Sequence, residues 1–85
     1  MIIIKDEEII LAVIKPMDKT EEPYIFLYFW DGGRLCYWDN KGRWNRSCYS
    51  ELDELYEDLS SLKIYEITTD ESVIKKYIMA MELLK

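Results

Sequence analysis

Carboxylates are the most concentrated reactive side chains in this chain. Five of them fall within residues 51–58, and residues 50–62 contain no lysine or arginine. Catalysis by paired carboxylates needs a cleft that separates their pKa values. The spacing instead places these acids on the outer side of an amphipathic helix, where solvent surrounds them. The chain also lacks histidine, the commonest catalytic base, so we expect no enzymatic activity.

The two cysteines, Cys36 and Cys48, are the remaining candidates for metal or redox chemistry. Two thiols without histidine cannot close a zinc site, and the CxxC spacing of redox motifs is absent. The two thiols could approach each other across a hairpin, so a disulfide stays open, but a reducing cytosol favours ordinary thiols. Gly32 and Gly33 fit a hairpin tip and lack the helix that follows a phosphate-binding loop. We therefore expect no metal and no cofactor.

Aromatic and basic side chains between residues 24 and 46 could bind a ligand by stacking. Rings of this kind stack on sugars and bases, while a neighbouring guanidinium group contacts a charged group. The candidate residues are Tyr28, Trp30, Trp38 and Trp44, with Arg34 or Arg43. The alternative is that these rings form the core and cross-strand pairs, because a small domain needs large side chains to fill its interior.

Residues 24–46 are expected to form two consecutive β-hairpins at the middle of one sheet. The unbroken apolar run at residues 24–30 ends at the sequence DGG, and the next run is followed by NKG at residues 40–42. The order NKG predicts a three-residue loop whose glycine takes the left-handed conformation. In that loop Asp39 faces Arg43, and Trp38 faces Trp44.

The length of the first turn decides which side chains share a face. With a three-residue turn, one face holds Phe26, Tyr28, Trp30, Cys36, Trp38 and Trp44, and the other holds Ile25, Leu27, Phe29, Leu35 and Tyr37. A two-residue turn at Gly32 and Gly33 would exchange the faces of the second strand. We prefer the three-residue turn because it gathers one aliphatic face. Either helices then cover both faces, or one face is left as an aromatic patch for a partner.

Short strands and two helices are predicted around the hairpins. Strands are expected at residues 1–4, 9–14 and 63–68, from their β-branched content and alternation. A first helix, with Ser50 as its N-cap, would bury a stripe of Leu52, Leu55, Tyr56, Leu59 and Leu62. A last helix, capped by Thr69 or Asp70, would bury Val73, Ile74, Tyr77, Ile78, Met81 and Leu84, leaving Met79 and Leu83 for a dimer contact.

These elements follow the order β-β-β-β-β-α-β-α. The order predicts a small single α+β domain spanning residues 1–85, with a mainly antiparallel sheet of about five to six strands and two helices. Helices on one face would leave the other face of the sheet open.

Charge and composition narrow the choice of partners. The net charge of −6 and the lack of a long basic run argue against direct binding of nucleic acid, whose phosphates are bound mostly by lysine and arginine. The longest apolar runs, at residues 9–14 and 24–30, are too short to cross a bilayer. The N-terminus lacks the basic start of a signal peptide. We expect a cytoplasmic protein, in the host cytoplasm if it is encoded by a phage, that binds a basic protein.

The uneven charge distribution suggests how such a protein would work. Residues 34–46 contain four bases and one acid, opposite in sign to the acidic segment that follows. Closely spaced carboxylates can imitate a phosphate backbone and occupy the basic groove of a nucleic-acid enzyme. The alternative is an ordinary solvated helix face. The candidate partner-binding residues are Glu51, Glu54, Glu57 and Asp58, together with Trp30, Trp38, Trp44 and Arg43.

The abundance of Ile, Lys, Glu and Tyr in a compact acidic chain is typical of small phage or mobile-element proteins. The sequence is therefore expected to encode a non-enzymatic protein-binding inhibitor that blocks a nucleic-acid enzyme. Such an inhibitor would be an anti-defence protein of the anti-CRISPR kind or an immunity protein. The alternatives are a small-ligand or nucleotide-binding module that uses the aromatic hairpin, and a dimeric regulatory or structural protein.

Overall fold

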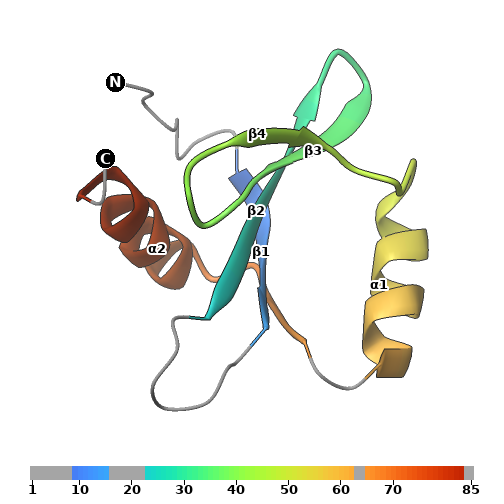
Figure 1. Ribbon diagram of the computed structural model, residues 1–85. Coiled ribbons are helices and arrows are strands. Elements are labelled where there is room, and N and C mark those ends of the chain that lie inside the picture. The colour runs from blue at the N-terminus through green and yellow to red at the C-terminus, as the bar shows by residue number, and fades with distance from the viewer. Residues whose placement is uncertain (1–8, 16–22, 63–64, 84–85) are drawn as a thin grey trace.

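The computed structural model describes residues 9–15, 23–62 and 65–83, without the side chains of residues 82 and 83. In chain order the elements are β1 (Ile9–Lys15), β2 (Tyr24–Asp31), β3 (Arg34–Trp38), β4 (Trp44–Arg46), α1 (Leu52–Leu62), β5 (Glu66–Thr68) and α2 (Glu71–Leu83). The strands form one antiparallel sheet in the order β4-β3-β2-β1-β5 (Figure 1). The predicted α+β fold with an antiparallel sheet and two helices is confirmed. The strand expected at residues 1–4 and the side chains of Leu83 and Leu84 lie outside the described residues.

The two helices cover opposite faces of the sheet (Figure 1). On one face α2 contributes Ile74, Ile78 and Met81 to a cluster with Ile9, Ala12, Ile25, Leu27, Phe29 and Cys36. On the other face α1 contributes Leu55 and Leu59 to a cluster with Leu11, Val13, Tyr28 and Leu35. Of the two arrangements that the sequence left open, the structure shows the one in which helices cover both faces of the described sheet, and neither face remains as an open aromatic patch. A strand covered on both sides needs apolar residues at successive positions, which explains the unbroken apolar run of β2.

The turn between β2 and β3 contains two residues, not three. Asp31 pairs with Arg34, and Gly32 and Gly33 occupy the turn with φ angles of 57° and 80°. Two successive positive φ values define the tight hairpin turn whose twist matches that of the strands, and a glycine pair adopts them without strain. The preferred three-residue turn was wrong because it assumed that one face had to be aliphatic, whereas both faces are covered.

The loop between β3 and β4 has the predicted form. The Asp39 amide donates to the Arg43 carbonyl at 3.0 Å, and Gly42, with φ of 74°, donates to the Asp39 carbonyl at 2.9 Å. Trp38 pairs with Trp44 across the two strands. The faces follow from both turns: Phe26, Tyr28, Trp30, Leu35 and Tyr37 lie on the α1 side, and Ile25, Leu27, Phe29, Cys36, Trp38 and Trp44 lie on the α2 side.

The N-terminus of α2 has one of its two expected caps, whereas α1 begins two residues after Ser50, its predicted N-cap. Asp70 caps α2, because its carboxylate accepts a hydrogen bond at 2.9 Å from the Ser72 amide. Helix α1 begins at Leu52, and the Ser50 hydroxyl lies 3.4 Å from the Glu54 carboxylate oxygens. Only Leu55 and Leu59 of α1 are buried, whereas Tyr56 and Leu62 are 37% and 50% exposed. The apolar stripe of α1 is thus narrower than predicted.

Candidate functional site

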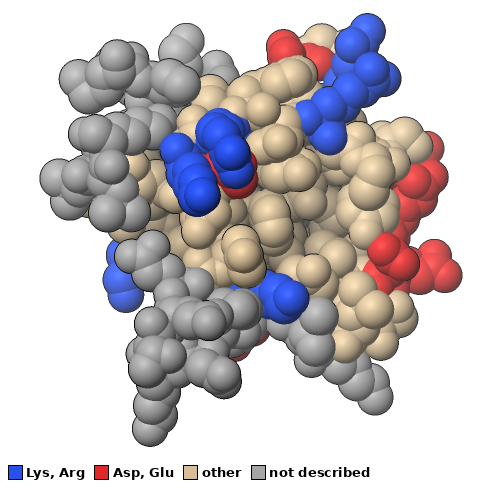
Figure 2. Space-filling view, viewed as in Figure 1, with Lys and Arg blue, Asp and Glu red and all other residues tan. Residues whose placement is uncertain are grey.

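The acidic residues of α1 line a groove on the surface of the molecule. The groove has a volume of about 590 Å³ and lies between α1 and the segment that links β4 to α1. Its lining comprises Cys48 and Tyr49 of the linking segment and Glu54, Glu57, Asp58 and Ser61 of the helix. Figure 2 shows the acidic side chains gathered along the edge of the molecule that α1 forms. We call this feature the acidic groove.

Neutral hydroxyl groups contact two of the three carboxylates, Asp58 through a hydrogen bond and Glu54 more weakly. The Tyr49 hydroxyl donates a hydrogen bond to Asp58, and the Ser50 hydroxyl lies 3.4 Å from both oxygens of Glu54. The hydrogen bond to Asp58, with some burial, raises the pKa of Tyr49, so this phenol stays protonated and keeps donating. A neutral donor orients a carboxylate without cancelling its charge. The groove therefore keeps its negative potential.

No cation neutralises the acidic groove within the part of the chain that the structure describes. The ion pair among the described residues joins Arg43 Nε to Asp39 Oδ2 at 3.0 Å, in the loop between β3 and β4 and not on α1. All five predicted acids of the helix region, Glu51, Asp53, Glu54, Glu57 and Asp58, are exposed. The structure thus places the acidic candidates Glu51, Glu54, Glu57 and Asp58 on one exposed helix and its approach.

The predicted basic candidate Arg43 belongs to a hydrogen-bonded loop. Asp39, only 8% exposed, accepts hydrogen bonds from the amides of Lys41 and Arg43, from Arg43 Nε and from Asn45 Nδ2 at 2.9 to 3.3 Å. Burial opposes ionisation of Asp39, but these donors outweigh it and lower the pKa of the carboxyl. The Arg43 side chain is nevertheless 70% exposed, so its role in partner binding stays a prediction.

The three tryptophans do not form one surface. Trp38 is half-buried and stacks on Phe29, with ring centroids 5.7 Å apart and planes 22° apart. Trp30 and Trp44 are 43% and 50% exposed, but Trp30 belongs to the α1 side and Trp44 to the α2 side. Tyr28 is buried. The shared face predicted for these rings was wrong, because it depended on the three-residue turn.

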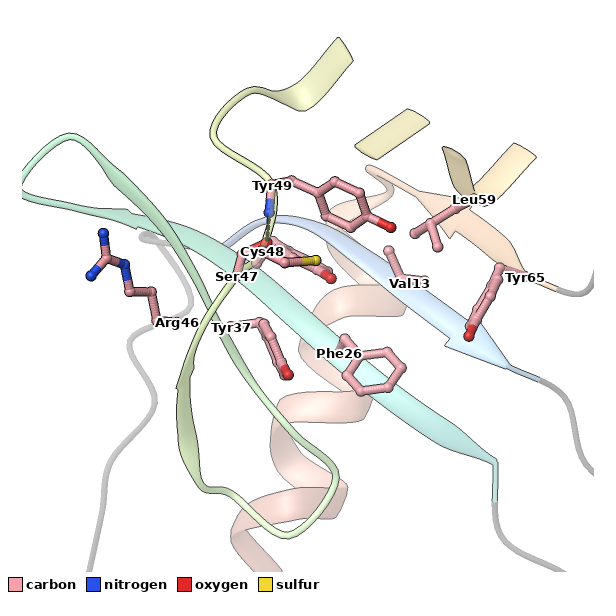
Figure 3. Close-up of a pocket in the computed structure, with 10 residues that line it drawn as sticks. Val13, Phe26, Tyr37, Arg46, Ser47, Cys48, Tyr49, Leu59 and Tyr65 are labelled. Carbon is pink, nitrogen blue, oxygen red and sulfur yellow. Dashed lines mark hydrogen bonds between the residues drawn. The ribbon is translucent and has the colours of Figure 1, made fainter. Parts of the chain in front are cut away.

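A tyrosine-lined cavity on the α1 side was not foreseen from the sequence. Figure 3 shows Phe26, Tyr37, Tyr49 and Tyr65 around one space. The cavity has a volume of about 260 Å³. Tyr28 lines the same cavity. The available signal was the two-residue turn, which moves Tyr37 to the face of Phe26 and Tyr28. The approach of Tyr49 and Tyr65 depends on tertiary packing that no local pattern reports.

Both cysteines are free thiols, as the sequence favoured. Cys36 is buried in the α2-side cluster, and burial raises the pKa of its thiol. Cys48 is exposed and lines the cavity on the α1 side. Among the described residues no cluster of three or more histidine, cysteine or acidic side chains could hold a metal ion. No helix in the described ranges is long and apolar enough to cross a membrane.

Comparison with known proteins gives no relative from which a function could be transferred. No protein-family model, curated protein or solved structure matches this chain. The acidic groove and the tyrosine-lined cavity, which share Cys48 and Tyr49, are therefore the candidate sites that its own side chains provide.

Proposed function

We propose that this chain is a small non-enzymatic protein that binds, and thereby inhibits, a nucleic-acid enzyme with a basic surface. The observation that carries the proposal is the acidic groove, whose three carboxylates have no cationic partner among the described residues. Lysine or arginine side chains of the enzyme would enter this groove. Anti-defence proteins of phages and mobile elements, including those of the anti-CRISPR kind, and immunity proteins of toxins are the classes with this mode of action.

The spacing of the groove acids supports imitation of a polyanion. Helical residues three or four positions apart rise by about 4.5–6 Å along the axis and share one face. Glu54, Glu57 and Asp58 have this spacing and line the groove together. An enzyme that holds a phosphate backbone with lysine and arginine presents matching positive charges. Occupation of those charges excludes the nucleic acid, which turns binding into inhibition.

The groove carboxylates favour both tight binding of the enzyme and fast association with it. A helix-borne acid held by a hydroxyl loses little side-chain freedom when an arginine binds it, so the entropic cost of association is smaller. Arginine can engage a carboxylate through two parallel hydrogen bonds, which adds geometric specificity. Long-range attraction by the acidic edge speeds association at low salt and weakens once the Debye length falls to about 10 Å or less.

The proposal is tested by measuring binding to purified nucleic-acid enzymes with basic grooves, including CRISPR effector nucleases and toxin nucleases, at low and high salt. The groove variant E54Q/E57Q/D58N should bind its target at least about tenfold more weakly than the wild type. The matched control D31N/E66Q/E71Q removes the same charge from three exposed acids outside the groove. It should bind within about threefold of the wild type, with a similar fall in affinity at high salt.

Inhibition of the bound nuclease is measured in parallel, because a contact that leaves cleavage intact would not block the substrate groove. Equal losses in the groove variant and the control would mean that net charge alone drives binding. Absence of binding to every enzyme of the panel at low salt would contradict the proposal.

A further inference from the structure

The tyrosine-lined cavity has the composition of an aromatic cage. Five aromatic rings line it: Phe26 and Tyr28 from β2, Tyr37 from β3, Tyr49 from the segment before α1 and Tyr65 from the segment before β5. Its volume of about 260 Å³ suits a small organic group, and Val13 and Leu59 complete its apolar lining. Figure 3 shows the labelled rings arranged around the same space.

Packing between the rings holds part of the cage in shape. Phe26 meets Tyr37 edge to face, with centroids 5.3 Å apart and planes 88° apart. Tyr28 lies 5.3 Å from Tyr37 at an angle of 43°. Such aromatic pairs stabilise their mutual orientation beyond the burial of their surface. The cavity is therefore lined by supported rings, which a ligand does not have to order on binding.

The electrostatic surroundings of the cage favour a cation. The faces of aromatic rings are negative, and they attract a cation placed within about 6 Å of the ring centre. The Tyr49 hydroxyl donates a hydrogen bond to Asp58, which places a carboxylate beside this ring of the cage. Arg46 also lines the cavity, but Figure 3 shows its guanidinium group directed away from the rings.

Tyr28 is held in its neutral form at the base of the cavity. Tyr28 is 5% exposed, and burial together with the neighbouring Tyr37, Tyr49, Cys48 and Tyr65 raises its pKa. The Tyr28 phenol therefore stays protonated, so the attraction for a cation comes from the ring faces and not from a phenolate. The whole chain, with a net charge of −6, adds a general attraction for cations.

We propose that the tyrosine-lined cavity is a cage that binds an alkylated ammonium group. The quaternary head of a choline-like molecule and a methylated lysine side chain carry this group, and both can insert a compact, weakly hydrated cation between aromatic faces. Binding of this cation would be a function separate from enzyme inhibition, because no nucleic-acid enzyme takes part in it. It also lies deeper against the sheet than the acidic groove, since Val13, Phe26 and Tyr28 line it and are absent from the groove.

A different chemistry for the same cavity is recognition of a neutral ligand by hydrogen bonds. Within the described residues the hydroxyls of Tyr28, Tyr37 and Tyr65 have no hydrogen-bond partner, and no side-chain polar atom is both sealed from solvent and unsatisfied. Solvent therefore reaches these hydroxyls, and a ligand that enters the cavity can accept hydrogen bonds from them. Substitution of a tyrosine by phenylalanine keeps the ring face and removes the hydroxyl. It should therefore weaken binding of a hydrogen-bonded ligand but not binding of a cation held by ring faces.

The test measures binding of choline by calorimetry, with no protein partner present, and of 3,3-dimethyl-1-butanol, in which carbon replaces the charged nitrogen. Choline should bind saturably, at least about tenfold more tightly than its neutral counterpart. Tyr37→Phe and Tyr65→Phe keep the ring faces and should bind choline within about threefold of the wild type. Tyr37→Leu and Tyr65→Leu remove a face and should weaken binding about tenfold.

Trp44→Leu is the matched control, because Trp44 is an exposed ring on the α2 side of the sheet. It should leave choline binding unchanged, and circular dichroism verifies the fold of each variant. A peptide with trimethyllysine is measured beside choline; tighter binding of the peptide identifies a protein source, and tighter binding of choline a small molecule. Either result supports the cage.

Equal binding of choline and the neutral alcohol, or absence of binding by both, would overturn the proposal. So would equal losses in the phenylalanine and leucine variants, since hydroxyl groups would then hold the ligand. Because no nucleic-acid enzyme takes part in these measurements, their failure would leave the proposed inhibition to be decided by its own experiment.

Discussion

At the scale of single residues, two carboxylates show opposite uses of the same group. Asp39 is buried and surrounded by donors, so its charge stabilises a loop. Asp58 is exposed and accepts a hydrogen bond from a neutral phenol, so its charge stays available to a partner. Sequence alone identified both as acids in polar segments. The difference arises from the hairpin loop around Asp39, which supplies backbone amides as well as a guanidinium group.

Asp39→Asn should lower the stability of the protein by about 1–2 kcal/mol at pH 7, because the variant loses the charge-assisted bonds to Arg43. The folded protein lowers the pKa of Asp39. The ionised carboxylate therefore contributes stability above its unfolded pKa of about 3.9, and this contribution is lost as the pH falls through the folded pKa. Urea unfolding at pH 7 and near pH 3 should show the difference between wild type and variant closing at the lower pH.

Asp31→Asn is the control for this series. Asp31 is an exposed aspartate beside the other hairpin turn, and its replacement should change stability little at either pH. A gap between wild type and Asp39→Asn that stayed constant from pH 7 to pH 3 would show that the carboxylate charge contributes nothing.

At the scale of elements, a single turn determines the chemistry of both sheet faces. The sequence predicted the hairpins, the second loop, most of β1 and the two helices from local signals, and it named Asp70 as one of two candidate caps for α2. It predicted the wrong length for the first turn, because DGG satisfies both a two-residue and a three-residue connection. Only the opposite placement of α1 and α2 decides between them, and no local pattern encodes that placement. The tyrosine-lined cavity was missed for this reason.

The two-residue turn makes a direct prediction about its glycines. Gly32→Ala and Gly33→Ala should each cost about 1–2 kcal/mol, because φ is 57° and 80° there and an L side chain is strained in that region. An added methyl group at either position would meet no atom within 4 Å beyond the adjacent residues, so steric conflict adds nothing. Gly32→Asn should be close to neutral, since asparagine favours the first position of this turn. Thermal unfolding of the three variants measures the differences.

If the three-residue turn formed in solution, the residue at position 32 would not need a positive φ angle. Alanine and asparagine would then be tolerated equally at that position. Backbone NMR contacts between Trp30 and Leu35, which pair in the two-residue register, provide an independent reading of the turn.

At the scale of the whole molecule, the acidic edge that we propose as a binding surface opposes stability. Within α1 and its approach, like charges stand three or four residues apart at several pairs, including Glu54 with Asp58 and Asp53 with Glu57. Each such pair destabilises a helix slightly. The core does not need these acids, because α1 is held to the sheet by Leu55 and Leu59. Folding does not require this concentration of acids on one exposed side, whereas a surface for a basic partner does.

This opposition predicts that the protein becomes more stable when its acidic edge is weakened. Sodium chloride should raise the melting temperature of the wild type, because salt screens repulsion between exposed charges. The variant E54Q/E57Q/D58N should melt about 2–4 °C higher than the wild type at low salt and respond less to added salt. In D31N/E66Q/E71Q the acids of the groove are intact, so this control should melt no higher than the wild type and keep the full salt response. An unchanged or lower melting temperature in the groove variant would mean that the carboxylates of α1 contribute to the fold, and the reason to assign them to a partner would disappear.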